Sequence, residues 1–570
     1  MSEVPRSLDD LLDAAVDWRD IDPDPETRAE LDTLIALARA GGVDRAGPLA
    51  ERFSGRLEFG TAGLRGELGA GPMRMNRVVV RQAAAGLARW LPAGSNVVIG
   101  FDARHKSDLF ARDSARVLAA AGHRPLVFPS VCPTPVLAFA LRHLGADAGV
   151  MCTASHNPAR DNGYKVYVGD GAQIIPPVDA EIAAAIVDAA AAPIALTEDG
   201  DHRIGEVGPE VLDAYLDHVV GLVPPGPRRL RIVYTPMHGV GGAVTLEAFR
   251  RVGFVDVHVV ESQELPDPDF PTVAFPNPEE PGALDRAETL AREVGADVVI
   301  ANDPDGDRLG VMVAHPASDG SFMALTGNEI GALLAERVLA TTTGADRLVV
   351  TTFVSSRLLS MMAEADNVHY AEVPTGFKWV VRPGLSDPAL RFVFGFEEAL
   401  GFSVDEVVRD KDGISAALRF AEVAAMAAAA GESVWDGLER LARRFGEHAT
   451  RTWSVRAEGA DGLARIASTM ATLRTDPPVS VGSSSVVRIT DLAVDPGGYP
   501  PTDAVVLDLD DRSRLCVRPS GTEPKLKVYV EVVELVPEGT GGYPAARASG
   551  SARVDQLIEA LAAVLGFDAP

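Results

Sequence analysis

One serine of this chain occupies a position where a side chain could carry a covalent group. Ser155 follows the short apolar run 148–152, and Asn157 and Pro158 come soon after it. Proline fixes φ, lacks an N–H group and biases the preceding residue away from helix, so we expect a sharp loop. Ligands gather where the strands of an open α/β sheet end. The sequence therefore predicts an exposed hydroxyl on a strand-ending loop, the alternative being a structural turn that the serine stabilises.

Three aspartates alternate with proline and glycine in a second loop. Asp303, Asp305 and Asp307 follow the apolar run 298–301. In an extended or gently turning loop this spacing brings three carboxylates to one side, and hard oxygen ligands in this number suit Mg²⁺. A calcium EF-hand does not fit, because the glycine is the fourth residue of the loop rather than the sixth. An acidic surface turn is the alternative.

A shared tripeptide precedes both loops. Gly145–Asp147 leads to the serine loop and Gly295–Asp297 leads to the aspartate loop, each through an apolar run. The same three residues recur at Gly344–Asp346 before another apolar run. Two strand–loop units with one lead-in indicate an internally duplicated α/β domain, and the third occurrence indicates a third copy.

The segment 518–525 has the composition of a phosphate-binding loop. It offers two cations, two hydroxyls and a glycine that lets backbone N–H groups approach a ligand, namely Arg518, Lys525, Ser520, Thr522 and Gly521. A phosphate dianion is bound by an arginine fork and small donors of this kind. A solvated turn between two strands is the alternative. Walker A spacing is absent from the chain, which disfavours a P-loop nucleotide enzyme.

Further polar side chains follow other apolar runs. Glu397 and Glu398 come after such a run, and one carboxylate there could recognise a sugar hydroxyl. Adjacent side chains need not converge, so a paired acid and base is a weak interpretation. Lys378 and Lys411 fall in segments expected to be exposed loops, where each could equally be surface charge.

Composition and charge describe a large globular protein. The 570 residues are 46% hydrophobic and 24% charged, and 53 basic against 81 acidic side chains give a net charge of −28. This balance argues against nonspecific binding to nucleic acid or anionic membranes. Three scattered cysteines predict neither a disulfide framework nor a zinc site. We find no apolar signal core at the start and no apolar stretch of membrane-spanning length, so we expect a cytoplasmic protein.

The pattern of elements predicts several α/β domains and a different C-terminal one. Apolar strands alternate with alanine-rich helices through most of the chain, which is typical of parallel sheets. Beyond about residue 453 strands dominate, and 526–531 alternates as a half-buried antiparallel strand does. The remaining expectations are a helix from 24 to 41, neither helix nor strand over 59–66, a linker at 224–227, a loop over 539–550 and a closing helix over 554–565.

Taken together and in order, these loops identify a family resemblance. The chain resembles the α-D-phosphohexomutase superfamily, the phosphoglucomutases and phosphomannomutases, over nearly its whole length, with a phosphoserine loop at 153–158, a magnesium loop at 303–308, a sugar-recognition loop at 397–401 and a phosphate-binding loop at 518–525. Segments 59–66 and 162–167 further resemble the longer subgroup that includes phosphopentomutase-type members.

The resemblance implies a fold and its boundaries. We expect an α/β protein in which three related mixed-sheet domains and a smaller α+β C-terminal domain surround a central cleft. The expected segments are a helical extension over 1–50, α/β domains over 51–225, 226–321 and 322–452, and a phosphate-binding domain over 453–570.

The resemblance also implies a mechanism and its residues. Mg²⁺ would be held by Asp303, Asp305, Asp307 and Ser155. The phosphorylated Ser155 exchanges its phosphoryl group with a sugar monophosphate through a sugar 1,6-bisphosphate that turns around. Arg65 and Arg308 would stabilise charge, and Lys165, ahead of His156, would relay the proton. The expected substrate-binding residues are Thr375, Gly376, Lys378, Glu397, Glu398, Lys411, Arg518, Ser520, Gly521, Thr522 and Lys525.

One departure bears on the substrate. Many glucose-directed members have a serine two residues after the first glutamate of the sugar loop, where this chain has Ala399. The lost hydroxyl contact argues against strict specificity for glucose or mannose and leaves a pentose 1-phosphate open. We expect interconversion of sugar 1-phosphate and 6-phosphate, with glucose or mannose as the sugar, and a phosphopentomutase acting on ribose or deoxyribose 1-phosphate as the alternative. A sugar phosphatase and a non-catalytic sensor are further alternatives. The expected partners are small sugar phosphates, with no nucleic acid or membrane, and the chain is expected to be a monomer or dimer.

Overall fold

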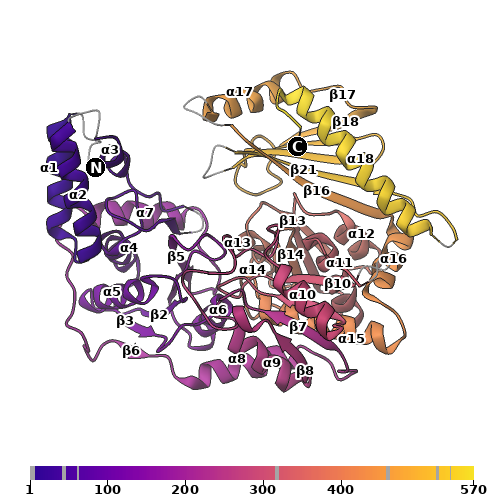
Figure 1. The fold of residues 1–570 in the computed structure, drawn as a ribbon, viewed down its shortest axis with the longest axis horizontal. Helices are drawn as coiled ribbons and strands as arrows, with labels where there is room; N and C mark the ends of the chain where they lie inside the picture. The colour runs from indigo at the N-terminus through magenta and orange to yellow at the C-terminus, as the bar shows by residue number, and fades with distance from the viewer. Residues whose placement is uncertain are drawn as a thin grey trace. The chain divides into compact units, whose positions relative to one another are not determined.

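The computed structural model describes residues 7–41, 46–60, 63–314, 320–457, 462–520, 525–539 and 541–569 (Figure 1). The chain forms two compact units. Unit 1 comprises residues up to Leu325 together with Leu400–Ala425, and unit 2 comprises Thr326–Ala399 together with the residues from Met426 onward. Each unit is described by itself.

Three helices open unit 1. They are α1 (Leu8–Ile21), α2 (Pro25–Gly41) and α3 (Gly47–Arg52), and α2 confirms the helix expected over 24–41. The Ser7 hydroxyl accepts a hydrogen bond from Asp10 N and so caps α1. Trp18 and Leu31 are buried in a core that these helices share with the first sheet.

The first sheet of unit 1 is parallel except at one edge. Its order is β1-β5-β4-β2-β3-β6, formed by Leu64–Glu67, Asp161–Val168, Ala148–Cys152, Asn96–Phe101, Arg124–Val127 and Gly205–Glu206. Strands β4, β2, β3 and β6 run parallel, whereas β5 and β1 are antiparallel to their neighbours. The expectation that 59–66 contains no strand was wrong from Leu64 on, because β1 pairs with β5 along its whole length.

The second sheet of unit 1 repeats this plan. Its order is β11-β10-β9-β7-β8, formed by Phe322–Ala324, Gly310–Ala314, Val298–Ala301, Arg231–Thr235 and Asp256–Val259. Strands β9, β7 and β8 are parallel, and β10 is antiparallel to β9. In both sheets the predicted functional loop therefore joins the last parallel strand to an antiparallel neighbour, as expected of a duplicated domain.

Helices connect these strands. Those of unit 1 are α4 (Arg77–Trp90), α5 (Ser107–Ala120), α6 (Thr134–His143), α7 (Val178–Ala189), α8 (Pro209–Gly221), α9 (Gly242–Val252) and α10 (Asp285–Val294), with the 3₁₀ helix η2 at Glu261–Gln263. Asn76 caps α4 by accepting a hydrogen bond from Val79 N. Two short stretches of the unit, β15 (Gly401–Ser403) and the buried first part of α15 (Gly413–Ala429), come from later in the chain.

Unit 2 contains a third parallel arrangement. Strands β13 (His369–Val373), β12 (Arg347–Thr352) and β14 (Arg391–Glu397) lie side by side and run parallel. The helices of this part are α11 (Gly327–Thr341), α12 (Leu358–Ala365), α13 (Phe377–Val380), α14 (Arg382–Ser386) and α16 (Val434–Phe445). Thr326 and Glu329 form a capping box at the start of α11.

The C-terminal part of unit 2 is an antiparallel sheet covered by helices. Its order is β16-β21-β20-β19-β18-β17, formed by Glu447–Arg456, Lys525–Glu534, Arg514–Pro519, Val505–Leu509, Ser484–Asp491 and Ser480–Val481. Helices α17 (Gly462–Thr475) and α18 (Gly542–Leu565) pack on it, and Figure 1 shows α18 in yellow along the strands. The expected loop over 539–550 was wrong, because α18 already begins at Gly542.

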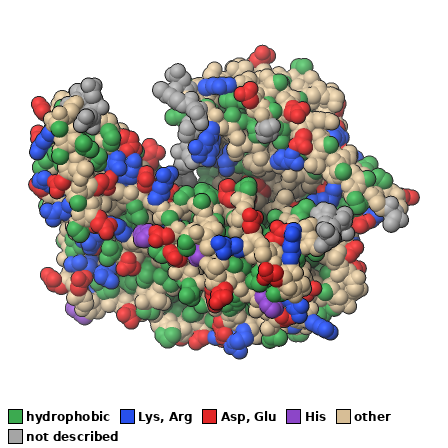
Figure 2. All heavy atoms as spheres, viewed as in Figure 1, with side chains coloured by type: hydrophobic (Ala, Val, Ile, Leu, Met, Phe, Trp, Pro, Cys, Tyr) green, Lys and Arg blue, Asp and Glu red, His purple; other side chains and the backbone are tan. Residues whose placement is uncertain are grey.

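The surface and the helices bear on the class of protein. On the face drawn in Figure 2, acidic and basic side chains are intermixed. Within the described ranges, no single helix is long and apolar enough to cross a membrane, although the bent pair Gly413–Ala429 and Val434–Phe445 together meets those two criteria.

Candidate active site

The serine loop of unit 1 connects β4 to the antiparallel β5 and turns sharply. The expectation of an exposed Ser155 hydroxyl was wrong, because the residue is buried where the serine and aspartate loops meet. Its φ of 55° lies in the left-handed region that non-glycine residues rarely adopt. Its N–H donates to Thr153 Oγ1 at 2.8 Å. A buried hydroxyl in a strained backbone indicates a position fixed for function, since such strain costs about 1–3 kcal/mol and persists only where the surroundings impose it.

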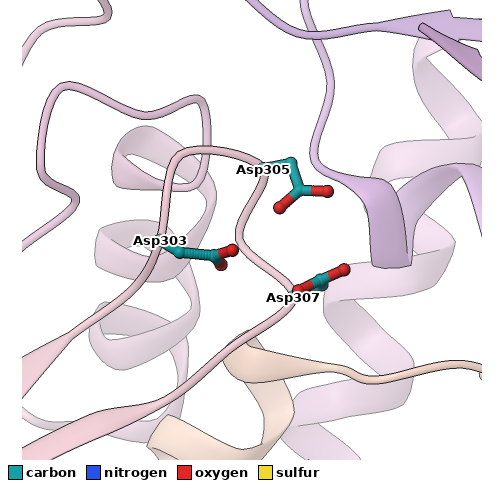
Figure 3. A group of neighbouring side chains, drawn as sticks. All are labelled: Asp303, Asp305 and Asp307. Atoms are coloured by element: carbon teal, nitrogen blue, oxygen red, sulfur yellow. The ribbon is translucent and has the colours of Figure 1, made fainter. Parts of the chain in front are cut away.

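The aspartate loop connects β9 to β10 and gathers three buried carboxylates (Figure 3). Asp303, Asp305 and Asp307 each offer an oxygen, and these oxygens lie within 4.8 Å of one another. The Oδ1 atoms of Asp305 and Asp307 are buried and have no hydrogen-bond partner among the described residues. Three convergent carboxylates with uncompensated oxygens fit a hard divalent cation such as Mg²⁺.

The close packing of these carboxylates shifts the pKa values of Asp303 and Asp305. Burial and the negative charges of Asp305 and Asp307 raise the pKa of Asp303 well above its usual range. Burial also acts to raise the pKa of Asp305, but the charge and hydrogen bond of Lys165 bring it below the usual value. The pKa values of the two carboxyls therefore shift in opposite directions, because Asp303 faces its negative neighbours whereas Asp305 is paired with a lysine.

The serine and aspartate loops meet, although 148 residues separate them. Ser155 Oγ donates to Asp303 Oδ2 at 3.1 Å, and His156 Nδ1 lies 3.2 Å from the same Oγ. Burial, followed by the positive charges of Arg308 and Arg65, lowers the pKa of His156 well below its usual range. The imidazole is thus neutral at neutral pH, and its Nδ1 lies within hydrogen-bond reach of the serine hydroxyl.

Two lysines contact the aspartates. Lys165 Nζ lies 2.8 Å from Asp305 Oδ2 and 3.0 Å from Asp307 Oδ2, and Lys411 Nζ lies 3.3 Å from the latter oxygen. Burial acts to lower the pKa of Lys165, but the two carboxylates raise it, so its ammonium is protonated at neutral pH. The expectation of an exposed Lys411 was wrong, because a buried lysine is tolerated when carboxylates such as Asp307 and Asp410 surround it.

The two predicted arginines lie at the same loops. Arg65, on β1, donates to Asn157 Oδ1 at 3.2 Å and so contacts the serine loop. Arg308 follows the aspartates, and its Nη1 lies 3.3 Å from Glu279 Oε2 and 3.4 Å from Asn277 Oδ1. Unit 1 thereby brings together nine predicted residues, Ser155, His156, Lys165, Arg65, Arg308, Lys411 and the three aspartates, whose roles stay predictions.

Unit 2 holds the predicted sugar-recognition residues. Glu397 ends β14, and Glu398 follows it. Glu398 Oε2 accepts from Ser355 Oγ at 3.2 Å and from Thr352 Oγ1 at 3.3 Å, while Glu398 N donates back to Ser355 Oγ at 3.1 Å. A hydroxyl at the end of β12 and one from the segment that follows it therefore orient this carboxylate.

The loop before α13 contains three further predicted residues. Thr375 is half-buried, and Gly376 has a φ of 107°, which favours glycine. Lys378 was expected in an exposed loop, but it is buried in α13 with its Nζ 5.6 Å from the centre of the Trp379 ring. The apolar stem of a lysine packs in this way when its charged end finds an aromatic face.

Three of the predicted phosphate-binding residues, Arg518, Ser520 and Lys525, lie at one end of the antiparallel sheet. Arg518 is on β20 opposite Lys527, and Ser520 N donates to the Lys525 carbonyl at 2.7 Å. Tyr529 forms a side-chain hydrogen bond with Arg518 and lies within the electrostatic influence of Glu398. Gly521 and Thr522 lie outside the described residues.

Sequence reasoning missed residues that support these loops. Thr134 Oγ1 donates to Asp305 Oδ2 at 2.7 Å from the start of α6. Ser355 orients Glu398, as described above. Arg104 binds the serine loop from the segment after β2. The available signal was the same for all three, namely a polar residue shortly after an apolar strand or at a helix start, but without repetition it does not stand out.

This arrangement can support phosphoryl transfer. In unit 1 the hydroxyl of a strained serine contacts Asp303 and His156, and the neighbouring aspartates contact Lys165 and Lys411. Oxyanion charge that develops on a transferring phosphoryl group would be stabilised there by preorganised positive groups.

Comparison with known proteins identifies relatives of the whole chain. Residues 56–192, 213–320 and 326–445 match α/β/α domains I, II and III of the phosphoglucomutase/phosphomannomutase family, and residues 482–535 match its C-terminal domain. The four matches confirm the predicted fold of three α/β domains and a distinct C-terminal domain.

Individual relatives agree with these matches. A Haemophilus influenzae protein named "Probable phosphomannomutase" is 41% identical over 468 residues, covering 80% of this chain and 93% of its own. A Staphylococcus aureus phosphoglucomutase is 36% identical over 504 residues, covering 85% and 90%. A solved structure of a family protein from Burkholderia thailandensis, 21% identical, covers 90% of this chain and 98% of its own with a TM-score of 0.66, which bears on fold alone.

Proposed function

Because the chain belongs to the phosphoglucomutase/phosphomannomutase family of the α-D-phosphohexomutase superfamily, we propose that it interconverts hexose 1-phosphates and hexose 6-phosphates. The observation that carries the proposal is the strained Ser155, whose hydroxyl hydrogen-bonds the carboxylate group. Glucose is the proposed hexose, with mannose as a second substrate. The pentose alternative has no support in the names of the relatives above and is not carried forward.

The chemistry follows from the residues of unit 1. In the first transfer, the bond between Ser155 Oγ and phosphorus breaks while a sugar hydroxyl oxygen bonds to phosphorus. The hydroxyl proton passes to a base, for which neutral His156 is the candidate, and the departing Ser155 Oγ takes up a proton in return. Lys165, which the sequence favoured as the base, is held protonated by Asp305 and Asp307, so we propose that it stabilises charge instead. Mg²⁺, when held by Asp303, Asp305 and Asp307, would neutralise charge on the phosphoryl oxygens.

The second transfer returns a phosphoryl group to the same serine. The sugar 1,6-bisphosphate turns around, its other phosphorus–oxygen bond breaks, and Ser155 Oγ is phosphorylated again. The bisphosphate is therefore both intermediate and activator. Glu397, Glu398 and Arg518 are the proposed groups for sugar and distal phosphate. We further propose that the protein acts on small sugar phosphates in the cytoplasm.

A phosphorylation experiment tests the proposal. The protein is incubated with glucose 1,6-bisphosphate and Mg²⁺, its intact mass is measured, and turnover of glucose 1-phosphate and mannose 1-phosphate is assayed. We expect one added phosphate on Ser155 and formation of hexose 6-phosphate. Ser155→Ala should lose both, whereas Ser54→Ala, which removes an exposed hydroxyl that donates to Glu51 O, should lose neither.

The other outcomes separate the alternatives. Inorganic phosphate released without hexose 6-phosphate would indicate a phosphatase. Binding of sugar phosphate without phosphorylation or turnover would indicate a sensor. Either result would overturn the proposal.

A further inference from the structure

One buried arginine contacts the serine loop through its backbone. Arg104 lies between β2 and α5, and its side chain is 1% exposed. Nη1 donates to the Pro158 and Asp161 carbonyls at 2.8 and 3.1 Å, and Nη2 donates to the Ser155 carbonyl at 2.7 Å and to the Asn157 carbonyl. A single guanidinium thus binds four carbonyl oxygens of the segment that carries Ser155.

Other groups fix the arginine itself. Asp102 Oδ2 lies 3.3 Å from Arg104 Nε, and Asp102 Oδ1 accepts from Ser107 Oγ at 2.7 Å and from Arg104 N at 3.0 Å. Asp102 N donates to the Cys152 carbonyl, which ends β4 directly before the loop. The Phe270 ring lies 5.0 Å from the guanidinium carbon. A carboxylate and an aromatic ring therefore hold the arginine in place, while its terminal nitrogens donate hydrogen bonds to the carbonyls of the serine segment.

The contacts matter because Ser155 is strained. Its left-handed φ of 55° requires the surroundings to impose it, and Pro158 lacks an N–H with which to bond the loop internally. Arginine suits this task, since its planar fork presents several donors in fixed directions, whereas a lysine ammonium acts as a point charge. The carbonyl of Ser155 is itself among the four acceptors.

We propose that Arg104 is a positioning residue that holds the serine loop in the strained conformation used by both phosphoryl transfers. The inference rests on the proposed function. In that reaction the Ser155 hydroxyl gives up a phosphoryl group and later receives one from the reoriented bisphosphate, so the hydroxyl has to keep the same position in both transfers. A displacement of about 1 Å costs about 100-fold in rate. Arg104 touches neither substrate nor the reacting atoms in this role.

The test compares Arg104 with a second arginine of unit 1 whose guanidinium also donates to backbone carbonyls and lies near an aromatic ring. Arg228 donates to the Pro224, Pro227 and Val252 carbonyls and lies 5.4 Å from the centre of the Phe254 ring, but these carbonyls belong to the linker and to the end of α9, not to the serine loop. Arg104→Lys and Arg228→Lys each keep one positive charge. Steady-state kinetics with glucose 1-phosphate and amide hydrogen exchange over residues 153–161 are measured for both.

We expect Arg104→Lys to lower kcat about 10- to 100-fold with less than about a threefold change in KM, and to speed amide exchange within 153–161. Arg228→Lys should leave kcat, KM and that exchange unchanged. Wild-type kcat and exchange in Arg104→Lys would overturn the proposal, as would faster exchange spread evenly over unit 1, because that pattern shows general destabilisation.

A second variant, Asp102→Asn, keeps the proposal testable if Arg104→Lys does not fold. Asp102→Asn removes the charge facing Nε and should change kcat and exchange in the same direction by a smaller factor; wild-type values for both would overturn the proposal if Arg104→Lys fails to fold. The exchange measurement also separates the two hypotheses. If the wild-type protein lacks mutase activity, the proposed function fails, while exchange over 153–161 still decides whether Arg104 positions the loop.

Discussion

Ser155 Oγ lies 3.1 Å from Asp303 Oδ2, so a hydrogen bond joins the loop that follows a strand of the first sheet to the loop that follows a strand of the second. The two loops leave equivalent positions of two similar sheets, after β4 and after β9. Because ligands collect at the carboxyl ends of parallel strands, duplicating the sheet supplies a second loop whose residues complement the first. The proposed nucleophile and the proposed cation ligands thus come from equivalent loops of two similar sheets.

The first prediction concerns the cation. Asp305→Asn should weaken Mg²⁺ binding at least about tenfold, because it removes a negative charge and one of the two buried Oδ1 atoms without a partner among the described residues. Calorimetry with Mg²⁺ measures the affinity, and chelator treatment should stop turnover until Mg²⁺ is restored. Asp297→Asn, which alters the aspartate before β9 that accepts from Arg231 N, is the control. Equal Mg²⁺ affinity in wild type and Asp305→Asn would contradict the assignment.

Local patterns predicted the loops but not their surroundings. A strand followed by proline, glycine and polar residues has a local signature, so Ser155 and the three aspartates could be found from the sequence. The burial of Lys411 could not, because the carboxylate with the shorter contact, Asp307, is over 100 residues away in the chain and reaches the lysine only in the fold. Arg104 was missed for a related reason, since its acceptors are backbone carbonyls, which have no sequence signature.

The start of α18 is another feature that local sequence patterns could not predict. Its first turns contain Gly542 and Gly550, which predict a loop by propensity. In the structure the helix packs along β16, and a Cβ at Gly550 would lie 2.8 Å from Ala449 Cβ. The glycine therefore permits a close approach between helix and strand, and tertiary packing outweighs its low helix propensity.

The second prediction concerns sugar choice. Ala399→Ser should raise the ratio of kcat/KM for glucose 1-phosphate over mannose 1-phosphate by roughly 2- to 10-fold, because a neutral hydrogen bond contributes about 0.5–1.5 kcal/mol. Wild type should convert glucose 1-phosphate and measurably one other sugar phosphate. Ala389→Ser, in the loop before β14, adds a hydroxyl elsewhere and should not change the ratio. A wild type with one substrate and no second activity would contradict the argument from Ala399.

The third prediction concerns pH and stability. Burial raises the pKa of Glu447 to about 7 from its ordinary 4.5, although Arg547 opposes the rise, and Glu329 adds to it. The folded state therefore binds more protons than the unfolded state between these values, so the free energy of unfolding falls as pH rises from about 4.5 to about 7.

Glu447→Gln should remove this dependence. The variant should match wild type near pH 4 and exceed its free energy of unfolding by up to about 3 kcal/mol at pH 8, since one pKa unit corresponds to about 1.4 kcal/mol. Urea unfolding at pH 4, 6 and 8 measures the difference between the two proteins. A difference that stays constant across these pH values would show that Glu447 titrates normally.

The last prediction concerns Arg518, which sits on β20 with its Nε buried and without a hydrogen-bond partner among the described residues. A mutase must retain its bisphosphate while the molecule turns around, and a guanidinium binds phosphate bidentately. A charge-assisted hydrogen bond contributes about 1.5–3 kcal/mol, which corresponds to roughly 10- to 100-fold in the rate of escape.

Arg518→Ala should therefore still pass a phosphoryl group from Ser155 to glucose 1-phosphate but then release the bisphosphate, leaving dephosphorylated protein. Its turnover should depend strongly on added glucose 1,6-bisphosphate, and mass spectrometry after substrate addition should show loss of the serine phosphate. Arg488→Ala removes an exposed arginine of the same sheet, paired with Asp508, and should retain wild-type behaviour. If Arg518→Ala isomerises glucose 1-phosphate at the wild-type rate without added bisphosphate, the loop after β20 is an ordinary turn, because nothing then depends on Arg518 to keep the intermediate bound.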